Sequence, residues 1–135
     1  MTEKEIKMEF IENHLNTFKS IVKRNTIRAY AIELPLDIGE NKKFADIVLI
    51  NEDPSKSFNE MQMFVLEFKK NKIEYGPIDQ LHMYVDFIHK RFYRKNPTVG
   101  ILVAPKFSAH EISQCKKYGY HALQLDNHFN MRFIV

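Results

Sequence analysis

The sequence predicts a single α/β domain with a mixed central sheet flanked by helices, and two observations support this. Segments whose apolar residues recur every three or four positions, as in helices, alternate with shorter apolar segments typical of strands. The order is a helix, three strands, a helix, a strand, a helix and one or two closing strands, which favours a meander followed by a parallel crossover. With 135 residues and no repeat or linker, residues 1–135 are expected to share one hydrophobic core.

The first half of the chain is expected to form one helix and three strands. Residues Glu3–Lys23 predict the helix through an apolar stripe at helical spacing, made of Met8, Ile11, Leu15, Phe18 and Val22. Alternating apolar residues predict a half-buried strand at Arg28–Leu36, and Gly39–Lys43 is typical of a turn. Two almost continuous apolar segments, Phe44–Ile50 and Met63–Lys69, predict buried strands separated by a polar loop.

The second half alternates helices and strands. Pro77 suits the first turn of a helix that is expected to continue to Lys95, where Asn96 and Pro97 end it. The apolar segment 99–104 predicts a buried strand. A Ser-x-x-Glu capping box and a final glycine predict a third helix over 108–119. Residues 121–125 and 129–135 are expected to form closing strands.

Composition excludes several classes of protein. Hydrophobic residues make up 44% of the chain and charged residues 27%, as in ordinary globular domains. The charged first ten residues do not resemble a signal peptide, and no window has the roughly 18 apolar residues that a membrane helix needs. The single cysteine, Cys115, cannot form an internal disulfide or a cysteine-rich zinc site, so a cytoplasmic location is expected. No small-molecule cofactor is expected.

The basic residues concentrate in one part of the chain. The formal net charge is +3, and residues 67–95 contain seven Lys or Arg against four Asp or Glu. A basic segment next to acidic residues suggests a polyanionic partner, although a solvated basic helix explains the same pattern.

Three charged residues, Asp46, Glu67 and Lys69, interrupt strands that are otherwise apolar. Burying an unpaired charge costs several kcal/mol, so these groups are expected to be paired or bound to a metal. Glu67 and Lys69 are two residues apart and share one face of their strand. If the two strands pair antiparallel with Ile50 opposite Met63, Asp46 lies directly opposite Glu67.

Two adjacent carboxylates provide the oxygen ligands that Mg²⁺ prefers. The metal would polarise a phosphate and activate a water, with Lys69 beside it. A buried cluster of ion pairs without a metal explains the same three residues equally well.

One stripe of the helix over 77–95 combines an amide, aromatic rings and two cations within an arc of about 80°. Its members are Gln80, Tyr84, Phe87, Arg91 and Lys95. Such a stripe suits a phosphate backbone that passes over the carboxylates. The alternative is an ordinary boundary face with half-buried rings.

These residues together resemble the PD-(D/E)XK nuclease superfamily. The resemblance lies in Asp46, in Glu67–Lys69, and in Gln80–Tyr84, which is similar to the Gln-x-x-x-Tyr motif of the RecB-like branch. The segment Gly100–Pro105, followed by a helix and Tyr118-Gly119-Tyr120, is similar to the catalytic domain of NucS-type endonucleases. The resemblance implies a restriction-endonuclease-like αβββαβ core.

It also implies a metal-dependent endonuclease that hydrolyses DNA in repair, recombination or the processing of viral or mobile-element DNA. The implied ligands of Mg²⁺ or Mn²⁺ are Asp46, Glu67 and the backbone carbonyl of Phe68. Lys69 would position the attacking water, and Gln80 would support the catalytic site.

Further candidates follow from the resemblance. The family often adds a glutamate from the first helix, and Glu12 is preferred over Glu9 and Glu5 because it flanks the apolar stripe. The candidates for DNA binding are Lys70, Tyr84, Arg91 and Lys95.

Two other functions and one assembly remain open. The chain could be a non-catalytic nucleic-acid-binding module with the nuclease fold, or an α/β domain that acts through protein contacts. A homodimer is expected, because an alternating C-terminal strand offers an edge for pairing; its apolar residues are Phe129, Met131, Phe133 and Val135. The alternative is that this strand closes the sheet of a monomer.

Overall fold

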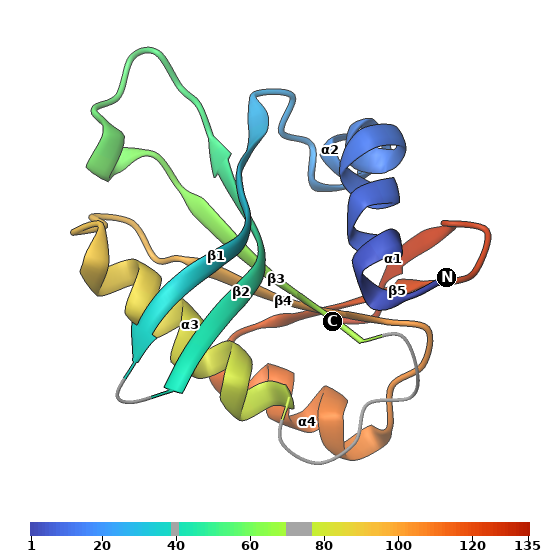
Figure 1. Cartoon of the computed structure of the whole chain (residues 1–135). Coiled ribbons are helices and arrows are strands. Elements are labelled where there is room, and N and C mark those ends of the chain that lie inside the picture. The colour runs from blue at the N-terminus through green and yellow to red at the C-terminus, as the bar shows by residue number, and fades with distance from the viewer. Residues whose placement is uncertain (39–40, 70–76) are drawn as a thin grey trace.

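One six-stranded mixed sheet forms the centre of the molecule in the computed structural model, which describes residues 1–38, 41–69 and 77–135 (Figure 1). The strands lie in sequence order: β1 (Ile27–Ile38), β2 (Asn41–Asn51), β3 (Met63–Phe68), β4 (Val99–Ala104), β5 (His121–Leu125) and β6 (Met131–Phe133). Strands β1, β2 and β3 are antiparallel, β3, β4 and β5 are parallel, and β6 is antiparallel to β5. The predicted meander and parallel crossover are therefore confirmed.

Helices cover both faces of this sheet (Figure 1). On one face lie α1 (Glu3–Glu9) and α2 (Leu15–Val22), joined by a π-helical turn at Phe10–His14. On the other face lie α3 (Pro77–Arg91) and α4 (Ala109–Tyr118). Each pair covers its own buried apolar cluster, so the strands between them are apolar on both faces.

The π-helical turn changes which residues of the first helix face the sheet. A regular α-helix would bury the predicted stripe, but the extra residue of a π turn rotates the helix before it relative to the helix after it. Phe10 and Phe18 are fully buried, whereas Met8 is 36% exposed. Lys7, three residues before Phe10, is buried with it. The prediction was therefore right about the helix and about Ile11, Leu15, Phe18 and Val22, which pack on the core, and wrong about Met8, in whose part of the helix Lys7 and Phe10 are buried instead.

The antiparallel register of β2 and β3 agrees with the one considered from the sequence. Ile50 lies opposite Met63, and the ladder continues to Ile47 opposite Leu66. The next pair in the same register is Asp46 and Glu67. The two acids therefore meet at the end of the β2–β3 ladder.

Helix α3 is shorter than predicted. It ends at Arg91, and Lys95 lies beyond it, because the chain turns at Tyr93, whose φ of 48° is left-handed. Arg94 is then buried, donates a 2.8 Å hydrogen bond to the carbonyl of Met61, and lies 4.4 Å from the centre of the Phe58 ring. These contacts attach the end of α3 to the loop before β3, which contains a short 3-10 helix (Phe58–Glu60).

Other boundaries differ little from the sequence predictions. The capping box of Ser108 with Glu111 and the left-handed Gly119 at the end of α4 are confirmed. The predicted turn at 39–43 is narrower, since β2 begins at Asn41, and residues 39–40 lie outside the described residues. The closing strand is limited to Met131–Phe133.

Close packing at Gly100 of β4 sets the position of α3. A side chain there would place its Cβ 2.9 Å from the ring of Tyr120 and 3.0 Å from Val85 of α3. Glycine therefore allows α3 to lie close against the sheet, beside the end of the β2–β3 ladder.

No helix in the described parts of the chain is long and apolar enough to span a membrane.

Candidate functional site

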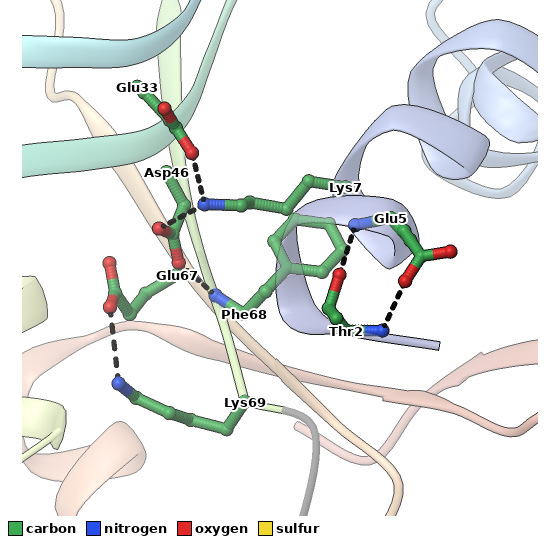
Figure 2. Close-up of polar contacts among 8 residues, drawn as sticks. All are labelled: Thr2, Glu5, Lys7, Glu33, Asp46, Glu67, Phe68 and Lys69. Carbon is green, nitrogen blue, oxygen red and sulfur yellow. Dashed lines mark hydrogen bonds and ion pairs between the residues drawn. The ribbon is translucent and has the colours of Figure 1, made fainter.

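The centre of the site is the Asp46 carboxylate at the end of β2. Its Oδ2 atom accepts a 2.8 Å hydrogen bond from the backbone N–H of Phe68 (Figure 2). This bond continues the attachment of β3 to β2 beyond the Ile47–Leu66 pair. The Asp46 side chain is 14% exposed. The backbone of β3 thus orients a carboxylate that solvent can still reach.

The first helix contributes a lysine to this carboxylate. The Lys7 ammonium donates to Asp46 Oδ1 at 3.0 Å and to Glu33 Oε1 at 3.2 Å, so it bridges two carboxylates (Figure 2). Its side chain is only 8% exposed. Burial lowers the pKa of Lys7, but the hydrogen bonds and charges of Asp46 and Glu33 outweigh it and raise the pKa overall.

Sequence reasoning missed Lys7 and Glu33. The available signal was the spacing of Lys7 with the buried Phe10 and Phe18, which becomes visible only once the π turn is known. Glu33 lies in the predicted strand β1, and its φ of 52° is rare for a residue other than glycine. The pattern of alternating residues contains no sign of that conformation.

Glu67 lies opposite Asp46 in a different environment. Its side chain is 5% exposed, and its Oε1 atom lies 3.5 Å from the Lys69 ammonium. Its Oε2 atom is buried and has no hydrogen-bond partner in the described parts of the chain. Burial, followed by the charge of Asp46, raises the pKa of Glu67 to about 8, while the charge of Lys69 opposes the shift. The protein therefore holds a carboxyl group whose bonding capacity is not met.

Helix α3 lies beside these acids, as the sequence predicted, but some of its residues that were expected at the surface are buried. Tyr84 is 3% exposed. Burial and then the charges of Glu67 and Asp46 raise its pKa to about 12. Gln80, one turn earlier on the same side of α3, is half-buried. Tyr84 is therefore not a surface residue, and the expectation that it contacts DNA directly is corrected.

The other expected DNA-binding residues are scattered. Arg91 is exposed at the last position of α3. Lys95 is exposed beyond the end of the helix, so the continuous helical stripe predicted from the sequence is wrong. Phe87 packs against the apolar cluster beneath α3. Lys70 lies outside the described residues.

Glu12 does not join the two acids. Its side chain is exposed in the π-helical turn. Within residues 1–38, 41–69 and 77–135, no three acidic, histidine or cysteine side chains form a group that could hold a metal. The residue that the first helix places at the site is the cation Lys7, which corrects the expectation of a glutamate.

The donor atoms nevertheless fit a hard divalent cation. Mg²⁺ demands oxygen ligands and usually takes only one or two carboxylates from the protein, with water in its other positions. Asp46 and Glu67 would supply two carboxylates, and the buried Oε2 of Glu67 lacks a partner. An unpaired buried oxygen of this kind costs about 1–3 kcal/mol, which a bound cation would offset.

A pocket of about 350 Å³ lies next to this cluster. Phe68 and Lys69 form one side of it, and Val103 and Pro105 belong to its lining. The Lys69 side chain is 27% exposed, so solvent reaches the end of β3.

Three solved structures that superpose on this chain are a repair endonuclease and EndoMS with and without double-stranded DNA. A repair endonuclease from Pyrococcus abyssi superposes with a TM-score of 0.66 at 21% identity, over 93% of this chain and 47% of that one. EndoMS in complex with double-stranded DNA gives 0.61 at 22% identity, over 90% and 44%. EndoMS in its apo form gives 0.52 at 21% identity, over 93% and 46%.

The chain has a restriction-endonuclease-like fold. The expected resemblance to NucS-type endonucleases is thereby confirmed for the fold. This chain spans less than half the length of each of these proteins. No protein-family model matches the sequence, and no curated protein is significantly similar to it.

Proposed function

We propose that this protein is a Mg²⁺- or Mn²⁺-dependent endonuclease that hydrolyses phosphodiester bonds in DNA, in repair or a related process. The observation that carries the proposal is the buried Oε2 of Glu67, which has no hydrogen-bond partner among the described residues. Glu67 and Asp46 are the next pair after Ile47 and Leu66 in the β2–β3 register. The shared fold with repair endonucleases, one of them in complex with double-stranded DNA, supports DNA as the substrate.

Asp46 and Glu67 would bind the metal, together with the backbone carbonyl of Phe68. The N–H of Phe68 holds Asp46 in place, so the backbone of one residue of β3 would serve both the ligand, through its N–H, and the metal, through its C=O. A bound metal would polarise the phosphate and lower the pKa of the attacking water.

The remaining roles belong to side chains around the two acids. Lys69 lies next to Glu67, and its ammonium would orient the attacking water and offset charge on the phosphate. Gln80 would support the site from α3. Tyr84 would form the buried floor between α3 and the acids, and Arg91, Lys95 and Lys70 would bind the DNA backbone.

A non-catalytic nucleic-acid-binding module remains the second candidate. The observation in its favour is that Lys7 neutralises Asp46 without a metal. Such a module would bind DNA but would neither bind Mn²⁺ nor cleave.

The test is a cleavage panel on labelled linear, nicked, flapped and four-way DNA with Mg²⁺ or Mn²⁺. We expect Glu67→Gln to lose cleavage and Mn²⁺ binding, and Lys69→Met to lose cleavage but retain Mn²⁺ binding. Glu12→Gln is the matched control, because this glutamate is exposed and outside the site. Cleavage by Glu67→Gln at the wild-type rate would contradict the proposal.

The proposal includes a homodimer in a reducing, cytoplasmic environment. Strand β6 lies at the edge of the sheet, which supports pairing with a second copy, and Cys115 is a buried free thiol. Phe133 contacts Phe18 of the same chain, so its replacement is a poor test of dimerisation. Light scattering after size exclusion is the direct test: a mass near 16.1 kDa at micromolar concentration would contradict the dimer.

A further inference from the structure

We propose that Lys7 is a built-in cation that fills the second cation position of this site, so that the protein binds one divalent metal ion and not two. The inference rests on the proposed function, since it concerns the same carboxylates. It assigns to the first helix a role in deciding how many metal ions the site accepts.

The position of Lys7 supports this role. Its ammonium lies between Glu33 Oε1 and Asp46 Oδ1, at 3.2 and 3.0 Å, and so supplies the positive charge that these two carboxylates would otherwise take from a second cation. In Figure 2 the Asp46 carboxylate separates this ammonium from Glu67. One oxygen of Asp46 therefore accepts a hydrogen bond from Lys7, and the other accepts one from the backbone N–H of Phe68.

The charge of the cluster points in the same direction. Among the described residues, the cluster holds three carboxylates, Glu33, Asp46 and Glu67, and two ammonium groups, Lys7 and Lys69. With all of them ionised, one divalent cation changes the sum from −1 to +1. A second divalent cation would bring it to +3 in a site that is largely buried, which is strongly unfavourable.

Packing keeps Lys7 in this position. Phe10, one turn further along the helix, is fully buried, and its ring lies 5.3 Å from that of Phe68 in an edge-to-face contact. The backbone that bears Lys7 is thereby attached to the same residue whose N–H holds Asp46. With a side chain that is 8% exposed, Lys7 has little freedom to leave for solvent.

Calorimetric titration with Mn²⁺ at fixed pH tests the inference. We expect the wild-type protein to bind one Mn²⁺ per chain, and Glu67→Gln to weaken this binding at least about tenfold. Lys7→Met, which removes the charge and keeps the length, should bind two. The double variant Lys7→Met/Glu33→Gln should return to one, because the second ion loses a ligand.

Three further variants control the measurement. Lys7→Arg keeps the cation and should bind one Mn²⁺, as should Lys4→Met, which removes an exposed lysine from the same helix. Glu33→Gln alone should also bind one, and its exposed position favours normal folding. If Lys7→Met does not fold, the wild-type protein still tests the inference, because two bound Mn²⁺ per chain would overturn it.

The outcomes separate this inference from the proposed function. Two Mn²⁺ in the wild-type protein, or one in folded Lys7→Met, would overturn the role of Lys7 while leaving a metal-dependent nuclease in place. No Mn²⁺ binding in the wild-type protein would overturn both.

Discussion

Asp46 and Glu67 carry the same charge on neighbouring strands and lie opposite each other, yet their surroundings differ. Both oxygens of Asp46 have partners, the Lys7 ammonium and the N–H of Phe68. Within the described parts of the chain, Glu67 has one partner, Lys69 at 3.5 Å, and its second oxygen is buried without one. The protein therefore stabilises the charge of Asp46, whereas burying Glu67 lowers the stability of the folded protein.

This difference shows which carboxylate carries the functional information. A buried charge that is fully paired is compatible with a purely structural role. A buried carboxyl group with one oxygen that has no partner in the described residues, and with a pKa raised to about 8, destabilises the fold unless something binds it. Glu67, more than Asp46, is thus the residue that indicates a ligand.

The largest expected effect is on stability, when the fully paired carboxylate of Asp46 is removed. Asp46→Ala leaves Lys7 buried with Glu33 as its remaining partner and removes the acceptor of the Phe68 amide. We expect a loss of roughly 2–4 kcal/mol in the free energy of unfolding, measured by urea denaturation in EDTA. Glu12→Gln, at an exposed position, should change it by less than about 0.5 kcal/mol. An equally small effect of Asp46→Ala would mean that Lys7 does not depend on this carboxylate.

The next largest effect is the pH dependence of the free energy of unfolding that Glu67 causes. Glu67 loses its proton near its ordinary pKa of 4.5 in the unfolded chain but near 8 in the folded metal-free protein. Between these values the folded state binds more protons, so its stability falls as pH rises, by at most about 1.4 kcal/mol per pH unit. The contribution is fully present below pH 4.5 and is lost as pH passes 8.

Glu67→Gln should remove this contribution. In EDTA it should be more stable than the wild-type protein at pH 8 by about 1–2 kcal/mol and show a flatter profile between pH 4.5 and 8. Unfolding midpoints at several pH values, with Glu12→Gln as the control, provide the measurement. Identical profiles for the wild-type protein and Glu67→Gln would place the pH dependence elsewhere.

The smallest effect concerns the surface beyond the two acids. Arg91→Ala and Lys95→Ala should weaken DNA binding and each reduce the slope of log Kd against log salt by about one unit. Lys19→Ala on α2 is the control, because α2 covers the opposite face of the sheet. Equal slopes in all three variants and the wild-type protein would mean that DNA lies away from the end of α3.

The sequence by itself determined the sheet and its flanking helices, and the meeting of Asp46 with Glu67 followed from an assumed register that the structure confirms. Apolar periodicity depends on local spacing, and the register of β2 and β3 follows from matching two short apolar segments. The capping box of Ser108 and the final Gly119 are likewise local signals, and they located α4 closely. The positions of the strands and helices could be predicted because each rests on residues that are neighbours in the chain.

Only the tertiary structure decided how the two acids differ. Lys7 reaches Asp46 from 39 residues away, on a helix whose buried face is set by a π turn, and Glu33 approaches through a left-handed backbone conformation. The burial of Tyr84 and the end of α3 at Arg91 depend on packing against β4 and the loop before β3. Burial and charge pairing are properties of long-range contacts, so a pattern of neighbouring residues does not contain them.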